Sequence, residues 1–218
     1  VNSVLREHLQ NKGYHSVAAR IVGDPRNPNR GGIVSWPKAQ KDLLNHLRED
    51  GNAIVTTMVD YYGMPSDGDK AWPGRREAVN CASPFERAHL VQERVAEMIA
   101  VKMGSGFDPN RFVPFVVMHE YEALLFSDCT ILAERLGDPS LAGNFQGIKE
   151  QFKDPEHIND SEETAPSKRI IKLFPRYKKQ KPLLGVLTAL QIGLPAIRAA
   201  CPHFNSWINA LESLAARP

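Results

Sequence analysis

The sequence predicts an α/β fold, in which a mainly parallel Rossmann-type sheet is flanked by helices and followed by a helical C-terminal cap. Residues 14–22, 53–59 and 112–118 are apolar and rich in β-branched side chains, as buried strands are. Segments of helix length separate them, which favours parallel pairing. From residue 128 the pattern is helical. We therefore expect an α/β core over residues 1–127 and a helical region over residues 128–218.

Composition limits the classes of function that need to be considered. The chain has 218 residues, 42% hydrophobic and 24% charged, which is ordinary for a globular protein. Its net charge of +2 means that an anionic partner must be met by a local basic patch. The three cysteines show no CxxC spacing, and no apolar run approaches transmembrane length. We expect a reduced, cytoplasmic protein that does not enter a membrane.

The first elements suggest that the chain starts inside its fold. Val1, Val4 and Leu5 already have the apolar spacing of a helix, so we expect a strand upstream of residue 1. Residues 24–32 form a loop rich in proline and glycine. This loop is either a solvated connector or a phosphate-facing loop that uses Arg26 and Arg30.

The helices of the first half carry clear signals. The helix over residues 36–49 has a buried stripe of Ala39, Leu43, Leu44 and Leu47. Residues 66–81 lack periodicity and suggest a lid or a binding loop. Ser83 and Glu86 form a capping box at the start of a helix that runs to about residue 103, with its apolar residues inward. They are Phe85, Ala88, Val91, Val95, Met98 and Ile99.

The second half consists of helical segments and two charged stretches. The charged stretches are an acidic loop at 154–164 and a basic run at 177–181. The predicted helices are 129–136, 141–152, 168–174, 182–192, 195–200 and 204–216. Glycines and prolines separate them, so we expect a cap of short helices.

Acidic residues follow two of the predicted strands. Asp60 ends the strand at 53–59, and Glu120 and Glu122 follow the strand at 112–118. Ligands and metals bind at the carboxyl edge of an open α/β sheet, where these side chains are expected to meet. Two or three carboxylates with water suit Mg²⁺ or Mn²⁺. His119 is expected to be structural, and zinc is disfavoured because no second histidine or cysteine lies at ligand spacing.

Basic residues offer candidate contacts to phosphate. Lys168 lies in the first turn of a predicted helix, and Lys178 and Lys179 belong to the basic run. Each is either a surface lysine or a phosphate ligand. The sequence lacks the GxxxxGK[ST], GxSxG and GxGxxG motifs, which disfavours P-loop hydrolysis, serine hydrolase chemistry and dinucleotide binding.

Four long stretches resemble a bacterial domain-of-unknown-function family with a Toprim-like fold. They are TTMVDYYGMP, FVVMHEYEALLFSD, INDSEETAPSKRI and IRAACPHFNSWINAL, and the resemblance extends over nearly the whole chain. Toprim domains of topoisomerases, primases and related nucleases hold Mg²⁺ through a Glu after the first strand and an acidic pair after a later one. The resemblance implies that Asp60 matches the first member of the pair, while Tyr62 stands at the second.

The resemblance also implies a function. Glu122 is similar to a further Glu of the nuclease-type Toprim branch, and Lys168 to its downstream Lys. Families of this kind are often encoded beside AAA-type ATPases in phage-defence clusters. We therefore expect metal-dependent hydrolysis of DNA or RNA, with Asp60, Glu120 and Glu122 as metal ligands and with Glu122 and Lys168 as catalytic groups. The expected partners are nucleic acid, an ATPase and, in a homo-oligomer, a second copy of the chain. The alternatives are a non-catalytic subunit that binds the ATPase, and a phosphatase or phosphotransferase for a small substrate.

Overall fold

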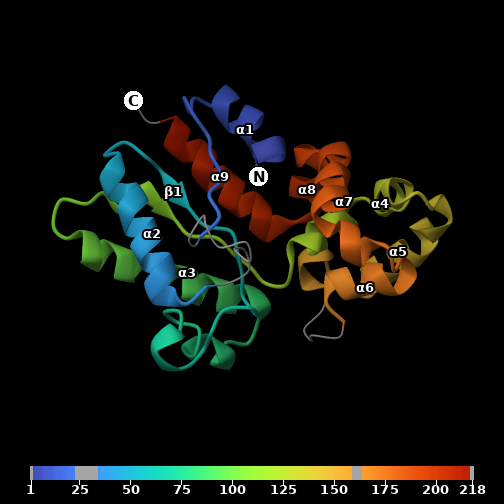
Figure 1. The fold of residues 1–218 in the computed structure, drawn as a ribbon, viewed down its shortest axis with the longest axis horizontal. Coiled ribbons are helices and arrows are strands. Elements are labelled where there is room, and N and C mark those ends of the chain that lie inside the picture. The colour runs from blue at the N-terminus through green and yellow to red at the C-terminus, as the bar shows by residue number, and fades with distance from the viewer. Residues whose placement is uncertain (1, 23–33, 159–163, 217–218) are drawn as a thin grey trace. The chain divides into compact units, whose positions relative to one another are not determined.

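The structure is a computed structural model that describes residues 2–22, 34–158 and 164–216. It is a mixed α/β structure in which helices dominate and the strands form short parallel pairs (Figure 1). The described α-helices are α1 (Asn2–Asn11), α2 (Trp36–Glu49), α3 (Pro84–Met103), α4 (Cys129–Leu136), α5 (Ala142–Lys149), α6 (Pro166–Leu173), α7 (Tyr177–Ile192), α8 (Leu194–Ala200) and α9 (Pro202–Ala215). The strands are β1 (Val55–Thr56), β2 (Val59–Asp60), β3 (Phe112–Val113) and β4 (Val116–Val117).

The contacts between residues divide the chain into two compact units. The central unit consists of residues 20–118, and the helical unit combines residues 1–19 with residues 119–218. This grouping differs from the division at residue 127 expected from the sequence, which stays a prediction. Each unit is described separately below.

The strands of the central unit are two short pieces of one parallel pairing. Strand β1 pairs with β3 and β2 pairs with β4, both parallel and with the same offset between partners. The interruption falls at Pro114, which has no N–H to donate to a ladder. Beside it, the Thr57 hydroxyl accepts a 3.0 Å hydrogen bond from the N–H of Phe115 and replaces the missing backbone pairing. The predicted parallel pairing is thus confirmed for these short segments.

The strand predicted at residues 14–22 is wrong. This segment has no strand pairing, and most of its side chains are exposed, including Ile21 at 62%. A strand gains stability in a sheet by burying one apolar face, and this segment buries none. Its ordered contacts are single hydrogen bonds, such as that from the Tyr14 hydroxyl to the Leu211 carbonyl at 2.8 Å.

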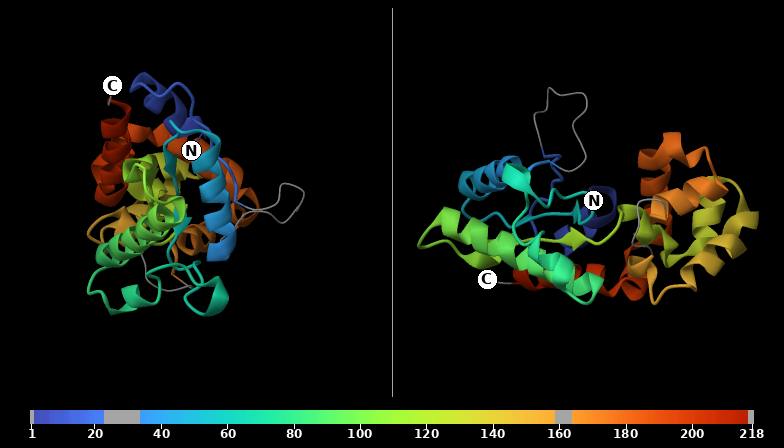
Figure 2. Two further views of the ribbon diagram at one scale, coloured as in Figure 1. Left: turned by 90° about the vertical axis from the view of Figure 1, so that its left-hand side faces the viewer. Right: turned by 90° about the horizontal axis from the view of Figure 1, so that it is seen from below.

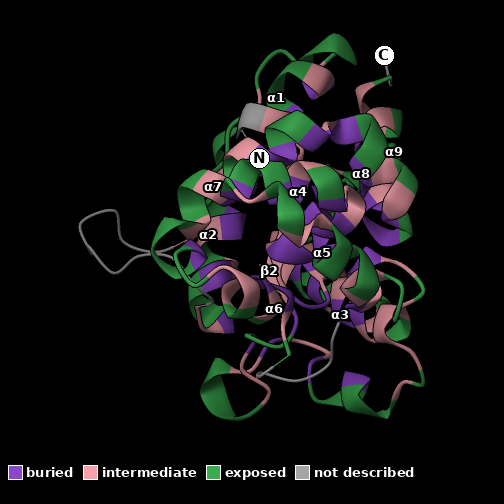
Figure 3. Cartoon of the chain, turned by 90° about the vertical axis from the view of Figure 1, so that its right-hand side faces the viewer, coloured by how far each residue is buried: buried purple, intermediate pink, exposed green. Residues whose placement is uncertain are grey.

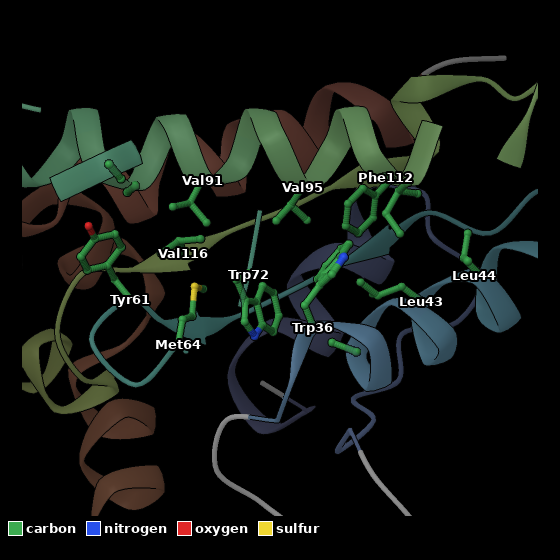
Figure 4. Packing of buried hydrophobic residues seen from close by; sticks show 14 of the residues in the cluster. Trp36, Leu43, Leu44, Tyr61, Met64, Trp72, Val91, Val95, Phe112 and Val116 are labelled. Atoms are coloured by element: carbon green, nitrogen blue, oxygen red, sulfur yellow. The ribbon is translucent and has the colours of Figure 1, made fainter. Parts of the chain in front are cut away.

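A hydrophobic core fills the central unit between α2, α3 and the strands (Figure 4). Val91 and Val95 of α3 point toward the strands, while Trp36 of α2 lies against Trp72 with ring centroids 5.2 Å apart. The predicted stripe of α2 is confirmed, since Ala39, Leu43, Leu44 and Leu47 are all buried. The four residues of α3 that the structure buries are Ala88, Val91, Val95 and Ile99.

The predicted start of α3 is also confirmed. The Ser83 hydroxyl accepts a hydrogen bond from the Glu86 N–H at 3.2 Å, and the Glu86 carboxylate accepts one from the Ser83 N–H at 3.3 Å. This capping box satisfies two backbone donors at the helix N-terminus. The expectation that Met98 points inward was wrong, because Met98 is 38% exposed.

The excursion at residues 66–81 packs into the central unit. It contains two short 3-10 turns, η1 (Gly68–Lys70) and η2 (Glu77–Asn80), and it buries Trp72. The indole N–H of Trp72 donates to the Val34 carbonyl at 2.9 Å. Arg75 is buried over the Tyr61 ring and donates to the Tyr61 carbonyl at 2.9 Å. These contacts anchor the excursion in the core of the central unit, and the expected lid or binding loop stays a prediction.

The helical unit is built from α1 and α4–α9, joined by the 3-10 helices η4 (Tyr121–Ser127), η5 (Pro139–Leu141) and η6 (Pro155–His157). Helices α4–α7, yellow to orange, group together in the views of Figure 2. Figure 3 shows buried and exposed residues alternating along α4 and α5, as expected for helices with one inner face. The helical C-terminal region expected from the sequence is therefore present.

Among the described residues, no single helix is both long and apolar enough to cross a membrane. Helices α7 and α8 pass a test of length and composition when taken together, although the chain bends by 88° between them.

Candidate functional site

The acidic segment expected to carry function connects β4 to η4. Glu120 is extended, and the chain then enters the 3-10 helix η4 at Tyr121. Four consecutive apolar residues of η4 are buried and anchor the segment in the helical unit: Ala123, Leu124, Leu125 and Phe126. Because η4 is fixed by this burial, the carboxylates just before it and within its first turn have defined neighbours.

Glu120 binds the N-terminus of α6. Its carboxylate accepts hydrogen bonds from the Ser167 N–H at 2.8 Å and from the Ser167 hydroxyl at 2.9 Å. Ser167 is itself buried, at 1% exposure. A negative charge at this position satisfies a free backbone donor and interacts favourably with the positive end of the helix. Glu120 therefore has a structural partner that sequence reasoning did not predict.

Glu122 is the most buried acid of the segment, and Lys181 of α7 is its partner. The Lys181 ammonium lies 3.2 Å from the Glu122 carboxylate and 3.8 Å from that of Glu120. Burial raises the pKa of Glu122, Lys181 lowers it and Glu120 raises it, with a net increase. Two carboxylates thus share one ammonium at a position with little access to water.

Two tyrosines enclose this group of charges. The Tyr121 hydroxyl donates to the Gly185 carbonyl at 2.9 Å, while Tyr177 is fully buried and its hydroxyl has no hydrogen-bond partner of acceptable geometry among the described residues. Burial, followed by the charge of Glu122, raises the pKa of both hydroxyls. A Cβ at Gly185 would lie 3.3 Å from the Tyr121 ring and 3.3 Å from the Tyr177 hydroxyl oxygen. Glycine at this position therefore lets the two tyrosines approach α7 closely. We call Glu120, Glu122, Ser167, Tyr177 and Lys181 the η4–α7 cluster.

The structure does not determine whether Asp60 joins this cluster. Asp60 ends β2 in the central unit, and its carboxylate accepts a 2.9 Å hydrogen bond from the Tyr62 N–H. Glu122 belongs to the helical unit, so the predicted convergence of the two acids stays a prediction. Within the described residues, no group of three or more His, Cys, Asp or Glu side chains is arranged to hold a metal ion.

The basic residues predicted to bind substrate have different locations. Lys168 is exposed in the first turn of α6, directly after the buried Ser167. Lys178 and Lys179 are exposed in the first turn of α7. Arg26 and Arg30 lie outside the described residues. His119 is buried, which agrees with the structural role expected for it.

The sequence contained a signal for the missing partners. Tyr177, Lys181 and Gly185 are spaced by four residues, which places them on one face of a helix. Pro182 hid this pattern, because a proline usually marks a helix start and the predicted helix began there. The structure instead continues α7 through Pro182, so the basic run is the first part of a helix that faces η4.

A second buried carboxylate lies elsewhere in the helical unit. Glu156 of η6 accepts hydrogen bonds from the N–H groups of His203 at 2.8 Å and Phe204 at 2.9 Å, and so caps α9. Burial raises the pKa of Glu156 to about 7. The sequence places this residue in an acidic loop, and nothing in the local pattern indicated a long-range cap.

These observations define a mostly helical α/β protein with a partly buried cluster of two carboxylates, a lysine and a tyrosine. The family model described as "Domain of unknown function (DUF4276)" matches residues 1–212, so the chain belongs to this family. The expected membership of a domain-of-unknown-function family is confirmed. Comparisons with curated proteins and with solved structures found no match.

Proposed function

We propose that this protein is a Mg²⁺- or Mn²⁺-dependent nuclease that hydrolyses phosphodiester bonds in DNA or RNA and acts as a defence effector together with an ATPase. The observation that carries the proposal is the buried carboxylate of Glu122, held beside Glu120 and Lys181 directly after the β4 segment. Buried acids with perturbed pKa values and a specific charged partner are typical of functional sites. The Toprim-like resemblance supplies the reaction class.

The donor set of the η4–α7 cluster fits a hard divalent cation. Mg²⁺ is commonly held by one or two carboxylates, with water and substrate phosphates completing its coordination. Glu120 and Glu122 would hold the ion, and the Tyr177 hydroxyl, which makes no hydrogen bond of acceptable geometry to the described residues, offers a further oxygen. Such an ion, when bound, supplies an activated water and neutralises charge on the phosphate.

The chain's own basic residues would position a nucleic acid. Lys178 and Lys179 are exposed on the same helix as Lys181, so they are available to phosphate oxygens. Lys168 is exposed on α6, next to the residue that binds Glu120. We propose that Lys168 or Lys181 stabilises the charge that develops on the scissile phosphate.

We also propose that the fold is Toprim-like, with a Rossmann-type parallel sheet. The two parallel strand segments and the helices α2 and α3 beside them support this proposal. An experimental structure of the protein tests it. A continuous parallel sheet that includes β1–β4 is expected, and isolated strand pairs without such a sheet would contradict the assignment.

The nuclease proposal is tested by incubating the intact protein with linear and circular DNA and with RNA, in Mg²⁺, in Mn²⁺ and in EDTA. Cleavage is expected only with the metals. Glu122→Gln should reduce the rate about 100-fold or more, as expected for a group acting at the reacting centre. Glu134→Gln, on the exposed face of α4, is the matched control and should leave the rate unchanged. Asp60→Asn tests the predicted second acid, and full cleavage by both Glu122→Gln and Asp60→Asn would refute the proposal.

The two lysines are distinguished by parallel substitutions. Lys168→Met and Lys181→Met each remove a charge, and Lys172→Met provides an exposed control on α6. Substitution of the lysine that stabilises the transition state should lower kcat more than it raises KM. A salt series separates nucleic acid from a small phosphorylated substrate, because contacts to a polymer backbone make binding fall steeply with salt.

A second candidate function is a non-catalytic subunit that binds the ATPase. It is favoured by the partners already present in the η4–α7 cluster, since Ser167 and Lys181 satisfy both carboxylates without a ligand. Tyr62, at the position of the second acid, also favours it. Co-purification with the ATPase and no cleavage would support this candidate, whereas metal-dependent cleavage lost in Glu122→Gln would exclude it.

A further inference from the structure

The Lys181 ammonium lies where a cation shared by Glu120 and Glu122 would lie. It is 3.2 Å from one carboxylate and 3.8 Å from the other, and no other ion pair to either acid occurs among the described residues. The Lys181 side chain keeps 34% of its surface exposed, whereas that of Glu122 keeps 10%. The ammonium is therefore the part of this group that can leave toward water.

The cluster retains an unsatisfied demand for positive charge. Two carboxylates share one ammonium, which lies 3.2 Å from the carboxylate of Glu122 and 3.8 Å from that of Glu120. Beside these acids, the hydroxyl of the fully buried Tyr177 makes no hydrogen bond of acceptable geometry to a described residue. A buried hydroxyl without a partner is rare in native proteins, and its oxygen is a suitable ligand for a hard cation.

Helix α7 gives Lys181 freedom to change partners. Pro182 follows it directly and has no N–H, so the Lys178 carbonyl lacks the usual bond within the helix. The turn that carries the lysines is consequently held less firmly than the rest of α7. Lys178 and Lys179 are exposed on this turn and would bring a phosphate close to Lys181.

We propose that Lys181 is a resident counter-ion that occupies a divalent-cation site formed by Glu120, Glu122 and Tyr177, and that a phosphate-bearing ligand draws the ammonium away and admits the cation. Lys181 then balances one of the two carboxylate charges at rest, and a divalent cation balances both in the complex. Only the identity of the phosphate ligand rests on the proposed nuclease function. The exchange itself is a property of the cluster.

The first test measures Mn²⁺ binding to the full chain by calorimetry and by electron paramagnetic resonance. Lys181→Met should bind Mn²⁺ at least about tenfold more tightly than the unmodified protein, because a nearby positive charge has been removed. Lys172→Met, which removes an exposed lysine of α6, should bind as the unmodified protein does. Glu122→Gln in the Lys181→Met background should abolish the gain. Equal binding by Lys181→Met and the unmodified protein would refute the proposal.

Loss of Lys181 leaves two uncompensated carboxylates, so the folding of Lys181→Met needs its own measurement. Its thermal midpoint should rise with added Mn²⁺ by more than that of the unmodified protein. Lys181→Arg keeps the charge and should respond as the unmodified protein does. If Lys181→Met is unfolded without metal, Mn²⁺ should restore its circular dichroism spectrum, and failure to do so would contradict the cation site.

The second step is tested with a short oligonucleotide in a buffer without metal. Adding it to the unmodified protein should tighten subsequent Mn²⁺ binding, and the same addition to Lys181→Met should have little further effect. An oligonucleotide that leaves Mn²⁺ affinity unchanged would overturn this step. These measurements do not depend on cleavage: tighter binding by a protein that cleaves nothing would support the cation exchange and refute the nuclease.

Discussion

Three glutamates of the helical unit show how neighbouring groups determine what a buried acid does. Glu120 and Glu156 each accept hydrogen bonds from backbone N–H groups at a helix N-terminus, which is a structural role. Glu122 has Lys181 as its charged partner and no helix to cap. Of the three, Glu122 is the acid whose removal should affect ligand binding more than folding.

Glu156 should make stability depend on pH. Its folded-state pKa of about 7 lies above the ordinary value of 4.5, so the folded protein binds the proton more tightly than the unfolded chain. This group's contribution to stability is therefore largest below pH 4.5 and is lost as the pH rises to about 7. The loss is at most about 1.4 kcal/mol per pH unit in that window.

The Glu156 effect is measured by urea unfolding of the unmodified protein and of Glu156→Gln between pH 5 and pH 8. The difference in unfolding free energy between them should shift in favour of Glu156→Gln as the pH rises to about 7, and then stay constant. Comparing the two proteins cancels the titration of other groups to first order. Parallel pH profiles would show that Glu156 does not titrate in this range.

Glu212 of α9 should have the opposite dependence. The Arg198 guanidinium, with His8 and Lys12, lowers the pKa of Glu212 to about 2. Its contribution is therefore complete above pH 4.5 and is lost as the pH falls toward 2. We expect Glu212→Gln to cost about 1 kcal/mol at pH 7 after solvent screening, and the cost to disappear in acid. Chemical unfolding at pH 7 and pH 3 measures this, and Glu134→Gln should show no such change.

At the scale of elements, capping and helical periodicity were good predictors, and strand patterns were not. The box of Ser83 and Glu86 located the start of α3, and the apolar spacing of α2 identified its buried face. Both signals depend only on residues that are close in sequence, so tertiary structure does not change the elements that they predict. The segment at residues 14–22 has strand-like residues, yet a strand also needs a partner and a buried face, which only tertiary structure supplies.

The candidate site could be predicted only in part for the same reason. The acids at the end of the strand at 112–118 were recognised because the sequence changes abruptly there from apolar to charged. Their partners Ser167 and Lys181 come from other helices, 47 positions from Glu120 in the case of Ser167. Such pairings follow from how helices pack, which no local pattern encodes.

The excursion at residues 66–81 should contribute to stability, as an element of the core. Trp72 is 4% exposed, packs on Trp36 and donates to the Val34 carbonyl. Trp72→Ala should therefore cost about 3–5 kcal/mol of unfolding free energy, the range for a large buried aromatic. Lys70→Ala, an exposed change in the same excursion, should cost less than about 0.5 kcal/mol. Urea unfolding followed by circular dichroism measures both free energies. A small effect of Trp72→Ala would show that the excursion does not stabilise the core.

At the scale of the whole molecule, the two units are connected in an unusual order. The central unit is one continuous segment, residues 20–118, inserted between the two parts of the helical unit. The first helix, α1, reaches its unit through the contact of His8 and Glu212 at 2.6 Å and the hydrogen bond of Tyr14 to Leu211. The termini of the chain thus belong to one unit, which explains why a division at a single point, as predicted, differs from the observed grouping.

Because each unit has its own buried core, we expect each to respond to its own core substitutions. Ile99 of α3 and Ile170 of α6 are both fully buried, one in each unit, so Ile→Ala at either should cost about 2–5 kcal/mol. Trp36 and Trp72 report on the central unit, and Trp207 reports on the helical unit. In a Trp207→Phe background, fluorescence should show a lower urea midpoint for Ile99→Ala and little change for Ile170→Ala. With Trp36→Phe and Trp72→Phe, Trp207 reports alone. Ile170→Ala should then lower the urea midpoint, and Ile99→Ala should change it little. Equal shifts of both reporters by either substitution would show that the chain unfolds as one cooperative unit.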